Sequence, residues 1–311
     1  MSISPNIFNT TRTSKPFIRV SSLKLTDALA CVLPFAFTPF ALQAEEIDLT
    51  KPVSESLSGI TGIYITGDTL ITDAETPYFP DSSGNEYHAA IDAGIGSPPS
   101  LTPGVDIPGT SGFGNAIRIE RKPEDSGTTG NPRAVATLPE HNNLAMVATS
   151  FTAGAWIKFN SIPDEPHAVV VMDRGGRSTT TGDNAGHWSF YLLQTTSGNW
   201  RMEFTQGDGI NTAQRTATAA TNWQVDLLNW NHVAFTYHYI APNNASISFY
   251  LNGTLLEEIP VSATLISSGS THWLPRRFTI GERPVSNYFS NFNGAIDDLF
   301  VTEGVHTFSP F

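Results

Sequence analysis

The stretch WNHVAFTYHYIAPNNASISFYLNGTLLEE, residues 230–258, decides the fold. Apolar side chains occupy every second position at 233–239 and again at 247–251, which is the pattern of two half-buried β-strands. Pro242 and the two asparagines after it suit a loop between these strands. Asn252-Gly253 supplies the two positive-φ residues of a tight type I′ turn, and a third strand is expected after it. This part of the chain therefore predicts an antiparallel meander.

Other segments repeat the strand pattern on both sides of this meander. Residues 151–159 alternate, residues 168–172 form a short apolar run, and alternation at 188–192 and 200–204 predicts a second hairpin. Further strands are expected at 60–65, 69–72 and 294–301, whereas the Gly- and Pro-rich residues 91–110 predict no regular element. Many short strands with no long amphipathic helix predict an all-β sandwich of antiparallel sheets.

The first 44 residues have the features of a secretory signal peptide. Four basic residues between positions 12 and 24 precede an apolar run at 29–42 that is too short to span a bilayer, and Ala44 stands before the acidic Glu45. A buried N-terminal helix is the alternative, which the prolines at 34 and 39 disfavour. We expect residues 1–44 to be a signal peptide, residues 45–57 an N-terminal extension and residues 58–311 the folded domain. The protein is then secreted, periplasmic or held at the cell surface.

The single cysteine and the net charge limit the possible partners. Cys31 lies inside the signal segment, so no disulfide is expected in the mature protein. A lipoprotein anchor is the alternative, but the apolar run follows this cysteine instead of preceding it. The chain has 17 basic and 29 acidic residues and a net charge of −12. Because phosphate binding requires clustered Lys and Arg, we expect no nucleic acid partner and no membrane insertion after signal cleavage.

Four segments match one family in the same order. They are DSSGNEYHAA (81–90), SGFGNAIRI (111–119), FTAGAWIKF (151–159) with WNHVAFTY…ISFYLNG (230–253), and FTIGERP…FNGAIDDLFV (278–301). These segments resemble the landmarks of bacterial laminin G-like domains in the concanavalin A-like lectin/glucanase superfamily. The resemblance covers residues 58–305, and it implies a two-sheet antiparallel jelly-roll with one concave face and a set of loops at its rim.

Two adjacent acids in the last segment, Asp297 and Asp298, are candidates for chemistry. Neighbouring side chains in a regular strand point to opposite faces, so these carboxylates are not expected to form an acid/base pair. The resemblance implies a structural Ca²⁺ at Asp297, for which Asp81, or carbonyl groups around Gly84 and Asn85, would supply further oxygen ligands. The alternative is that Asp81 caps its own turn and Asp297 accepts backbone hydrogen bonds.

Signatures of an enzyme are weak in this sequence. Retaining glucanases place Glu, Asp and Glu on one face of a strand, and no strand here has that spacing, since Glu203 stands alone. Of the jelly-roll lyase motifs only a fragment at 201–203 is present, and there is no Gly-x-Ser-x-Gly turn. His232 and His238 share a strand face but stand too far apart to hold one zinc ion. We therefore identify no catalytic residue.

The candidate ligand-binding residues lie in loops. His272, Trp273 and Arg276 share one loop, Arg177 lies in a second and Tyr288 in a third. Aromatic rings stack on the CH face of sugars while guanidinium groups bind hydroxyls, so these loops suit a glycan if they converge. The alternative is that Trp273 fills a gap in the sandwich.

Two tryptophans in the strands also have alternative roles. Trp230 stands at a strand entry and is expected to anchor the core rather than to bind sugar, because burial of an indole is strongly favourable. Trp156 and Lys158 face away from the apolar side of their strand. Trp156 therefore either lines a ligand groove or is covered by a loop.

The leading functional hypothesis is a secreted, non-catalytic module that binds a glycan or the surface of an extracellular protein. The first alternative is a carbohydrate-active enzyme, a glycoside hydrolase or polysaccharide lyase with an unrecognised active site. The second is a structural or adhesive surface protein. Glycan binding, polysaccharide turnover and self-association distinguish the three hypotheses.

Overall fold

The computed structural model describes residues 44–92, 97–120, 133–137, 149–162, 168–174, 188–195, 199–207, 214–218, 223, 225–261, 277–281, 289–290 and 292–311. All of them lie in one contact unit of the chain, Gln43–Phe311. Strands make up more than half of these residues, and the helix among them is a single turn, α1 (Val53–Ser56). Over these ranges no helix has the length and apolar character needed to cross a membrane.

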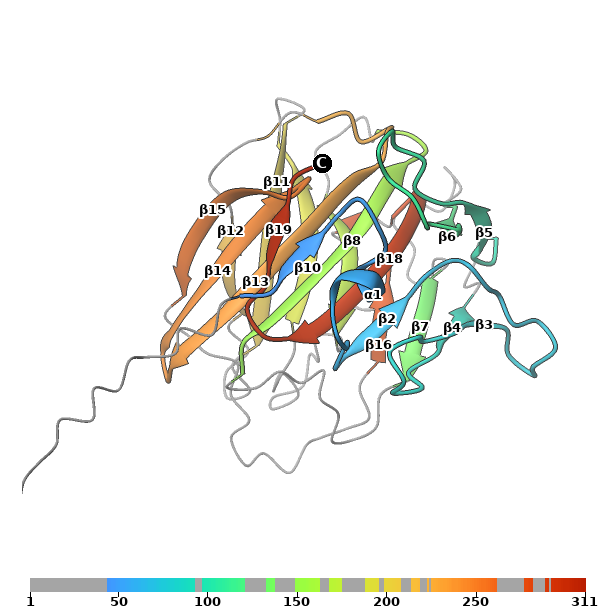
Figure 1. Cartoon of the computed structure of the whole chain (residues 1–311), viewed down its shortest axis with the longest axis horizontal. Coiled ribbons are helices and arrows are strands. Elements are labelled where there is room, and N and C mark those ends of the chain that lie inside the picture. The colour runs from blue at the N-terminus through green and yellow to red at the C-terminus, as the bar shows by residue number, and fades with distance from the viewer. Residues whose placement is uncertain are drawn as a thin grey trace, which may run out of the picture. The chain divides into compact units, whose positions relative to one another are not determined.

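One sheet is built around the predicted meander (Figure 1). In spatial order its strands are β15 (Thr254–Val261), β14 (Asn244–Leu251), β13 (Asn231–Ala241), β8 (Phe151–Phe159), β18 (Gly294–Glu303), β6 (Asn115–Ile119) and β5 (Ser100–Pro103), and β2 (Ile63–Ile65) also pairs with β18. All of these pairs are antiparallel. Asn252 and Gly253 have φ angles of 51° and 79°, which confirms the predicted tight turn.

The second sheet contains the predicted second hairpin. In spatial order its strands are β12 (Gln214–Thr218), β11 (Trp200–Gly207), β10 (Trp188–Gln194), β9 (Ala168–Arg174), β16 (Arg277–Ile280), β7 (Arg133–Thr137), β4 (Ala89–Asp92) and β3 (Tyr78–Phe79), and β17 (Phe289–Ser290) runs parallel to β9. Phe190 of β10 lies opposite Phe204 of β11, as the two alternating segments predict.

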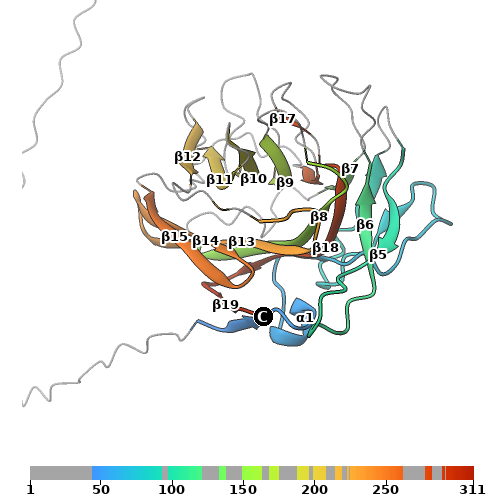
Figure 2. The same ribbon diagram turned by 90° about the horizontal axis from the view of Figure 1, so that it is seen from above.

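The core lies between these two sheets, which Figure 2 shows as two layers seen edge-on. Phe235 of β13 and Phe249 of β14 are both fully buried there. The ring of Phe235 lies 4.8 Å from that of Phe204 and 5.7 Å from that of Trp188, both in the opposite sheet. The predicted all-β, two-sheet antiparallel sandwich is confirmed.

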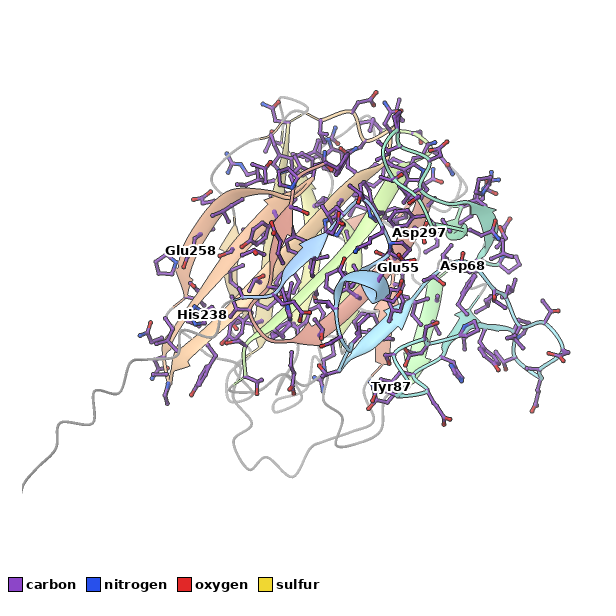
Figure 3. All side chains as sticks on the ribbon, in the orientation of Figure 1. Glu55, Asp68, Tyr87, His238, Glu258 and Asp297 are labelled. Carbon is purple, nitrogen blue, oxygen red and sulfur yellow. The ribbon has the colours of Figure 1, made fainter. Side chains whose placement is uncertain are left out.

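The edge strand β15 carries polar and restricting residues. Glu258 is exposed on it, as is Pro260, and the labelled Glu258 lies at this margin of the sheet in Figure 3. Charged side chains and proline on an edge strand oppose pairing with a second chain. This edge is therefore built to remain unpaired.

A third layer packs on the sheet that contains the meander, on the face opposite the core between the two sheets (Figure 2). It consists of α1 and a parallel pair formed by β1 (Glu46–Asp48) and β19 (Thr307–Ser309). Between this layer and the sheet lies a second apolar group, which we call the outer cluster; it includes Ile47, Leu49, Val53, Tyr64, Val105, Trp156, Trp230, Phe300 and Phe308. Residues 45–57, expected to form an extension, are thus packed onto the sheet.

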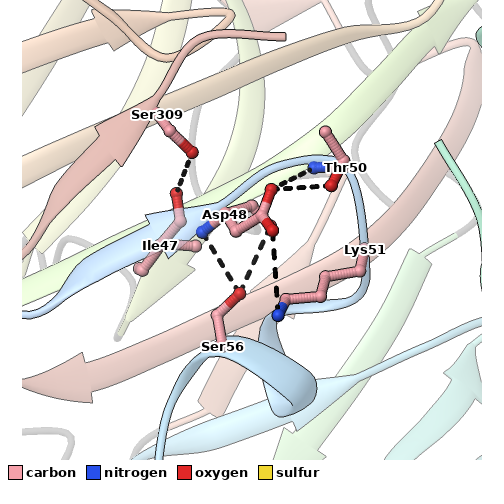
Figure 4. Close-up of polar contacts among 6 residues, drawn as sticks. All are labelled: Ile47, Asp48, Thr50, Lys51, Ser56 and Ser309. Carbon is pink, nitrogen blue, oxygen red and sulfur yellow. Dashed lines mark hydrogen bonds and ion pairs between the residues drawn. The ribbon is translucent and has the colours of Figure 1, made fainter. Parts of the chain in front are cut away.

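The turn between β1 and α1 is fixed by Asp48 (Figure 4). Its carboxylate accepts hydrogen bonds from the N–H and the hydroxyl of Thr50, at 3.0 and 2.7 Å. The Ser56 hydroxyl accepts the Asp48 N–H at 3.1 Å, and the Ser309 hydroxyl donates to the Ile47 carbonyl at 3.3 Å. These bonds hold α1 and β19 to β1.

Two local expectations are wrong. Residues 69–72 form no strand but only a single bridge between Ile71 and Tyr78. Residues 91–110, expected to lack regular structure, contain the end of β4 and all of β5. Ser100–Pro103 pairs with β6 at the sheet edge, where proline is tolerated, and this tertiary pairing overrides the low strand propensity of the sequence.

Candidate functional site

A β-bulge in β18 sets up the candidate site. Ile296 and Leu299 face the core between the sheets, whereas Asp297 and Asp298 both contact residues of the outer cluster. The pairing of β18 with β8 shifts register between Asp297 and Phe300, and Asp298 has a φ of 49°. The prediction that the two carboxylates point to opposite faces is therefore wrong, because the bulge interrupts the alternation of the strand.

Asp298 fastens the third layer to the sheet. Its carboxylate oxygens accept the Val53 N–H at 3.2 and 3.0 Å, and the Tyr64 hydroxyl donates to it at 2.5 Å. Burial raises the pKa of Asp298 to about 7, and burial together with this carboxylate raises the pKa of Tyr64. These contacts give Asp298 a structural role at the start of α1.

The Asp297 carboxylate is held by backbone N–H groups from two parts of the chain. One of its oxygens accepts the Asp298 N–H at 2.8 Å, and the other accepts the Val105 N–H at 3.2 Å. Burial raises its pKa to about 6, and the negative charge of Asp68 acts in the same direction. Asp297 is thus a nearly inaccessible carboxylate with a second acid near it.

The residues around Asp297 form a small cradle of oxygen atoms. A Cβ atom on Gly104 would come within 2.5 Å of the Asp297 carboxylate and 2.9 Å of the Gly114 carbonyl oxygen. A Cβ atom on Gly114 would collide with the carboxylate of Asp68. Figure 3 shows the labelled Asp68 and Asp297 in the same region, near β6. Carboxylate and carbonyl oxygens are the donor types that Ca²⁺ prefers. In this structure the Gly114 carbonyl accepts the Gly104 N–H at 3.1 Å, and Asp68 accepts the Asn115 N–H at 2.8 Å.

Asp81, the other predicted metal ligand, has a different environment. Its carboxylate accepts hydrogen bonds from the N–H groups of Tyr64, Ser83 and Tyr87 at 2.9, 3.0 and 2.9 Å, and from the Ser83 hydroxyl at 2.8 Å. Within the described ranges, no group of three or more His, Cys, Asp or Glu side chains is arranged to hold a metal. The calcium site with Asp297 and Asp81 stays a prediction, and the contacts make Asp68 a further candidate ligand.

A pocket opens on the same face of the sheet, next to Gly104. Its volume is about 360 Å³, and the polar and aromatic residues that line it are Thr102, Asp106, Arg118, Lys158, Asn160 and Trp230. They come from β5 and the segment after it, from β6, from β8 and its end, and from the residue before β13. The pocket thus collects two cationic groups, a carboxylate, an amide, a hydroxyl and an indole from four separate parts of the chain.

Residues 129–307 match the laminin G model of the concanavalin A-like lectin/glucanases superfamily, over more than half of the 311-residue chain. The chain belongs to this family. The family resemblance is therefore confirmed, over a region that contains the last two of the four segments and begins after those at 81–90 and 111–119. Lys158, Asn160 and Trp230 of the pocket lie inside the region that matches the laminin G-like family, and Asp106 and Arg118 precede it.

Several solved structures are similar to this laminin G-like protein. Domain 4 of an extracellular arabinanase from Geobacillus stearothermophilus, in complex with arabinotriose, is 17% identical with a TM-score of 0.45, over 80% of this chain and 94% of that one. The binding domain of botulinum neurotoxin serotype D/C is 17% identical with a TM-score of 0.44, and the match spans 78% of this chain but 49% of the toxin domain. A sialidase module from Ruminococcus gnavus, bound to α2,3 sialyllactose, is 16% identical with a TM-score of 0.39, and the match covers 52% of this chain and 80% of that module. No curated protein matches the sequence.

The loop residues predicted to bind ligand lie outside the described residues. They are His272, Trp273, Arg276, Arg177 and Tyr288. Their convergence at one rim of the laminin G-like domain remains a prediction. The pocket beside Gly104 is a separate candidate that the sequence did not indicate. The alternation at 151–159 did predict that the Lys158 side chain points away from the core between the sheets.

Both strand tryptophans have structural roles. Trp230 is 5% exposed and packs in the outer cluster, which confirms it as an anchor, and its remaining surface lines the pocket. Trp156 is fully buried among the rings of Phe113, His232 and Phe311, so the interpretation as a covered side chain is confirmed.

The outward face of the second sheet holds a polar group that the sequence also missed. Glu203 of β11 accepts a hydrogen bond from Tyr191 of β10, and Asp173 of β9 accepts one from Ser189 of β10. Asp173 is the penultimate residue of β9. Glu203 therefore shares a sheet face with a second acid two strands away, which is the observation that keeps the enzyme alternative open.

Proposed function

We propose that this protein is a secreted, non-catalytic glycan-binding module of the laminin G-like family, and that the pocket beside Gly104 is its binding site. A signal peptide at residues 1–44 would direct it to the periplasm, the cell surface or the medium. The observation that carries the proposal is the pocket itself. At about 360 Å³ it falls within the range of small-molecule sites, and it joins an indole to several hydrogen-bonding groups. Such groups satisfy sugar hydroxyls, and the small part of the Trp230 indole that reaches the pocket offers an apolar contact to CH groups.

The amide of Asn160 offers the sharpest test of this site. It is exposed at the end of β8, so its removal is not expected to disturb the core. Asn160→Ala is expected to weaken glycan binding about tenfold, because a hydrogen bond to the sugar is lost. Binding is measured by glycan array and then by calorimetry with the best ligand.

The matched control is Asn244→Ala. Asn244 is also an exposed asparagine, but it is the first residue of β14 and pairs with Ala241, at the end of β13 remote from Trp230. Its removal is expected to leave the affinity unchanged. Equal affinities of the Asn160 variant and the wild type would reject the pocket as the site. Capture of a protein with no glycan bound would favour the protein-surface alternative. Release of new sugar ends from a polysaccharide, abolished by Glu203→Gln, would favour the enzyme.

We also propose a structural Ca²⁺ ion at Asp297. The cradle of oxygen atoms around Gly104 supports it, as does the burial of two acids with raised pKa values on one side of a bulge. The ion would neutralise charges that the buried site otherwise disfavours.

Calcium is expected to raise the melting temperature of the wild-type protein relative to chelator. At a concentration 100-fold above Kd, the gain in free energy of unfolding is about 2.7 kcal/mol. Asp297→Asn is expected to abolish this response, whereas Asp226→Asn, at an exposed turn acid, is expected to retain it. Comparison of Asp68→Asn with Asp81→Asn then identifies the second carboxylate. A calcium response that persists in the Asp297 variant would place the ion elsewhere or exclude it.

A further inference from the structure

Two cationic side chains flank the floor of the pocket. Ala295 of β18 pairs with Arg118 of β6 on one side and with Lys158 of β8 on the other. Residues paired across adjacent strands point to the same face, and strands lie about 4.8 Å apart, so the two cationic residues stand about 10 Å apart at their Cα atoms. Because alanine is small, the space between the two cations stays open above it.

Lys158 has no carboxylate to neutralise it in the part of the chain that the structure describes. The other lysine in those ranges, Lys51, pairs with Asp48 at 3.7 Å, whereas no described acid approaches the Lys158 ammonium within 4.0 Å. Its ammonium lies over the ring of Trp230, with the nitrogen 5.9 Å from the ring centroid. In a chain of net charge −12, an ammonium held over an indole at a pocket wall is available to a ligand.

The acids near the pocket do not neutralise the site between Arg118 and Lys158. Arg118 pairs with Glu120, but both side chains are more than 40% exposed, and such exposed pairs exchange partners at little cost. Asp106 is the acid of the pocket, and it belongs to the segment after β5, outside the row formed by Arg118, Ala295 and Lys158. Asp106 suits sugar hydroxyls, which donate hydrogen bonds, and the row suits an acceptor with negative charge.

We propose that the pocket selects an acidic sugar, whose anionic group lies between Arg118 and Lys158 above Ala295. The inference rests on the proposed glycan-binding function and adds the ligand class. The anionic group is a carboxylate, as in a uronic acid, or a sulfate ester, and both offer the oxygen acceptors that guanidinium and ammonium groups bind.

The test compares three oligosaccharide probes of equal length by calorimetry: oligogalacturonate, a sulfated galactan fragment and its neutral counterpart. An acidic probe is expected to bind about tenfold tighter than the neutral one, and this ratio is expected to fall as salt is added. The tighter of the two acidic probes identifies the anionic group. Binding of the neutral probe with equal or greater affinity would overturn the inference and leave the proposed function intact. Absence of binding by all three, and by a wider glycan array, would overturn both.

Charge variants show whether the preference arises at this row. Lys158→Met keeps an unbranched side chain over Trp230 and removes the charge, and it is expected to bring the ratio between acidic and neutral probes close to one. Arg118→Gln is expected to reduce the ratio in the same direction, and Asp106→Asn to raise it. Lys51→Gln, which removes a lysine outside the pocket, is the matched control and should keep the wild-type ratio. If the Lys158 variant still prefers acidic probes, the preference arises at another part of the protein and the inference is wrong.

Discussion

Phe235→Ala is expected to lower the free energy of unfolding by about 3–5 kcal/mol. The side chain is fully buried, and its ring lies within 5.7 Å of four other rings, those of Phe151, Trp188, Phe190 and Phe204. Three of these belong to the opposite sheet, so the variant opens a cavity at the junction of the two layers. Urea unfolding followed by tryptophan fluorescence measures the loss.

Ile240→Ala is the matched control, since Ile240 belongs to the same strand, β13, but is 55% exposed. Its effect is expected to stay within about 0.5 kcal/mol. A loss of less than about 1 kcal/mol for Phe235→Ala would mean that the ring does not bridge the two sheets, and the sandwich as described would be wrong.

The sandwich was predictable because its determinants are local. The alternation around Phe235 and Phe249 specifies which face of each strand is buried, and Asn252-Gly253 specifies the turn between β14 and β15. β5 was missed for the opposite reason. Ser100–Pro103 has little intrinsic preference for a strand, and its conformation depends on pairing with β6, which no local pattern records.

The candidate site was not predictable by the same means. The bulge at Asp297 and Asp298 adds a residue that strict alternation does not allow for, so the assumption of opposite faces failed at the position where the two acids meet the outer cluster. The pocket depends on the pairing of Arg118 and Lys158 with Ala295. These three residues lie far apart in the sequence. Their proximity follows from strand order in the sheet, which the periodicity of a single segment does not contain.

His232 is expected to make the protein lose stability in acid. Its ring is fully buried, and within the described ranges neither ring nitrogen has a hydrogen-bond partner. Burial lowers the pKa of this imidazole from 6.5 to about 3. The folded state therefore keeps the ring neutral, while the unfolded chain binds a proton below pH 6.5. The stability contributed by this group is complete above pH 6.5 and is lost as pH falls toward 3, by about 1.4 kcal/mol for each pH unit.

His232→Phe isolates this effect, because phenylalanine retains a ring next to Trp156 and Phe308 but does not titrate. Relative to the variant, the wild type is expected to lose about 2 kcal/mol between pH 6.5 and pH 4.5, measured by urea unfolding. Asp297 and Asp298 act with the opposite sign. Their raised pKa values favour the folded state at low pH, and that contribution is lost as pH rises through about 6 and about 7. Both acids are present in both proteins, so their effect cancels in the difference. A difference that does not change with pH would show that solvent reaches the imidazole and that the third layer does not seal this part of the sheet.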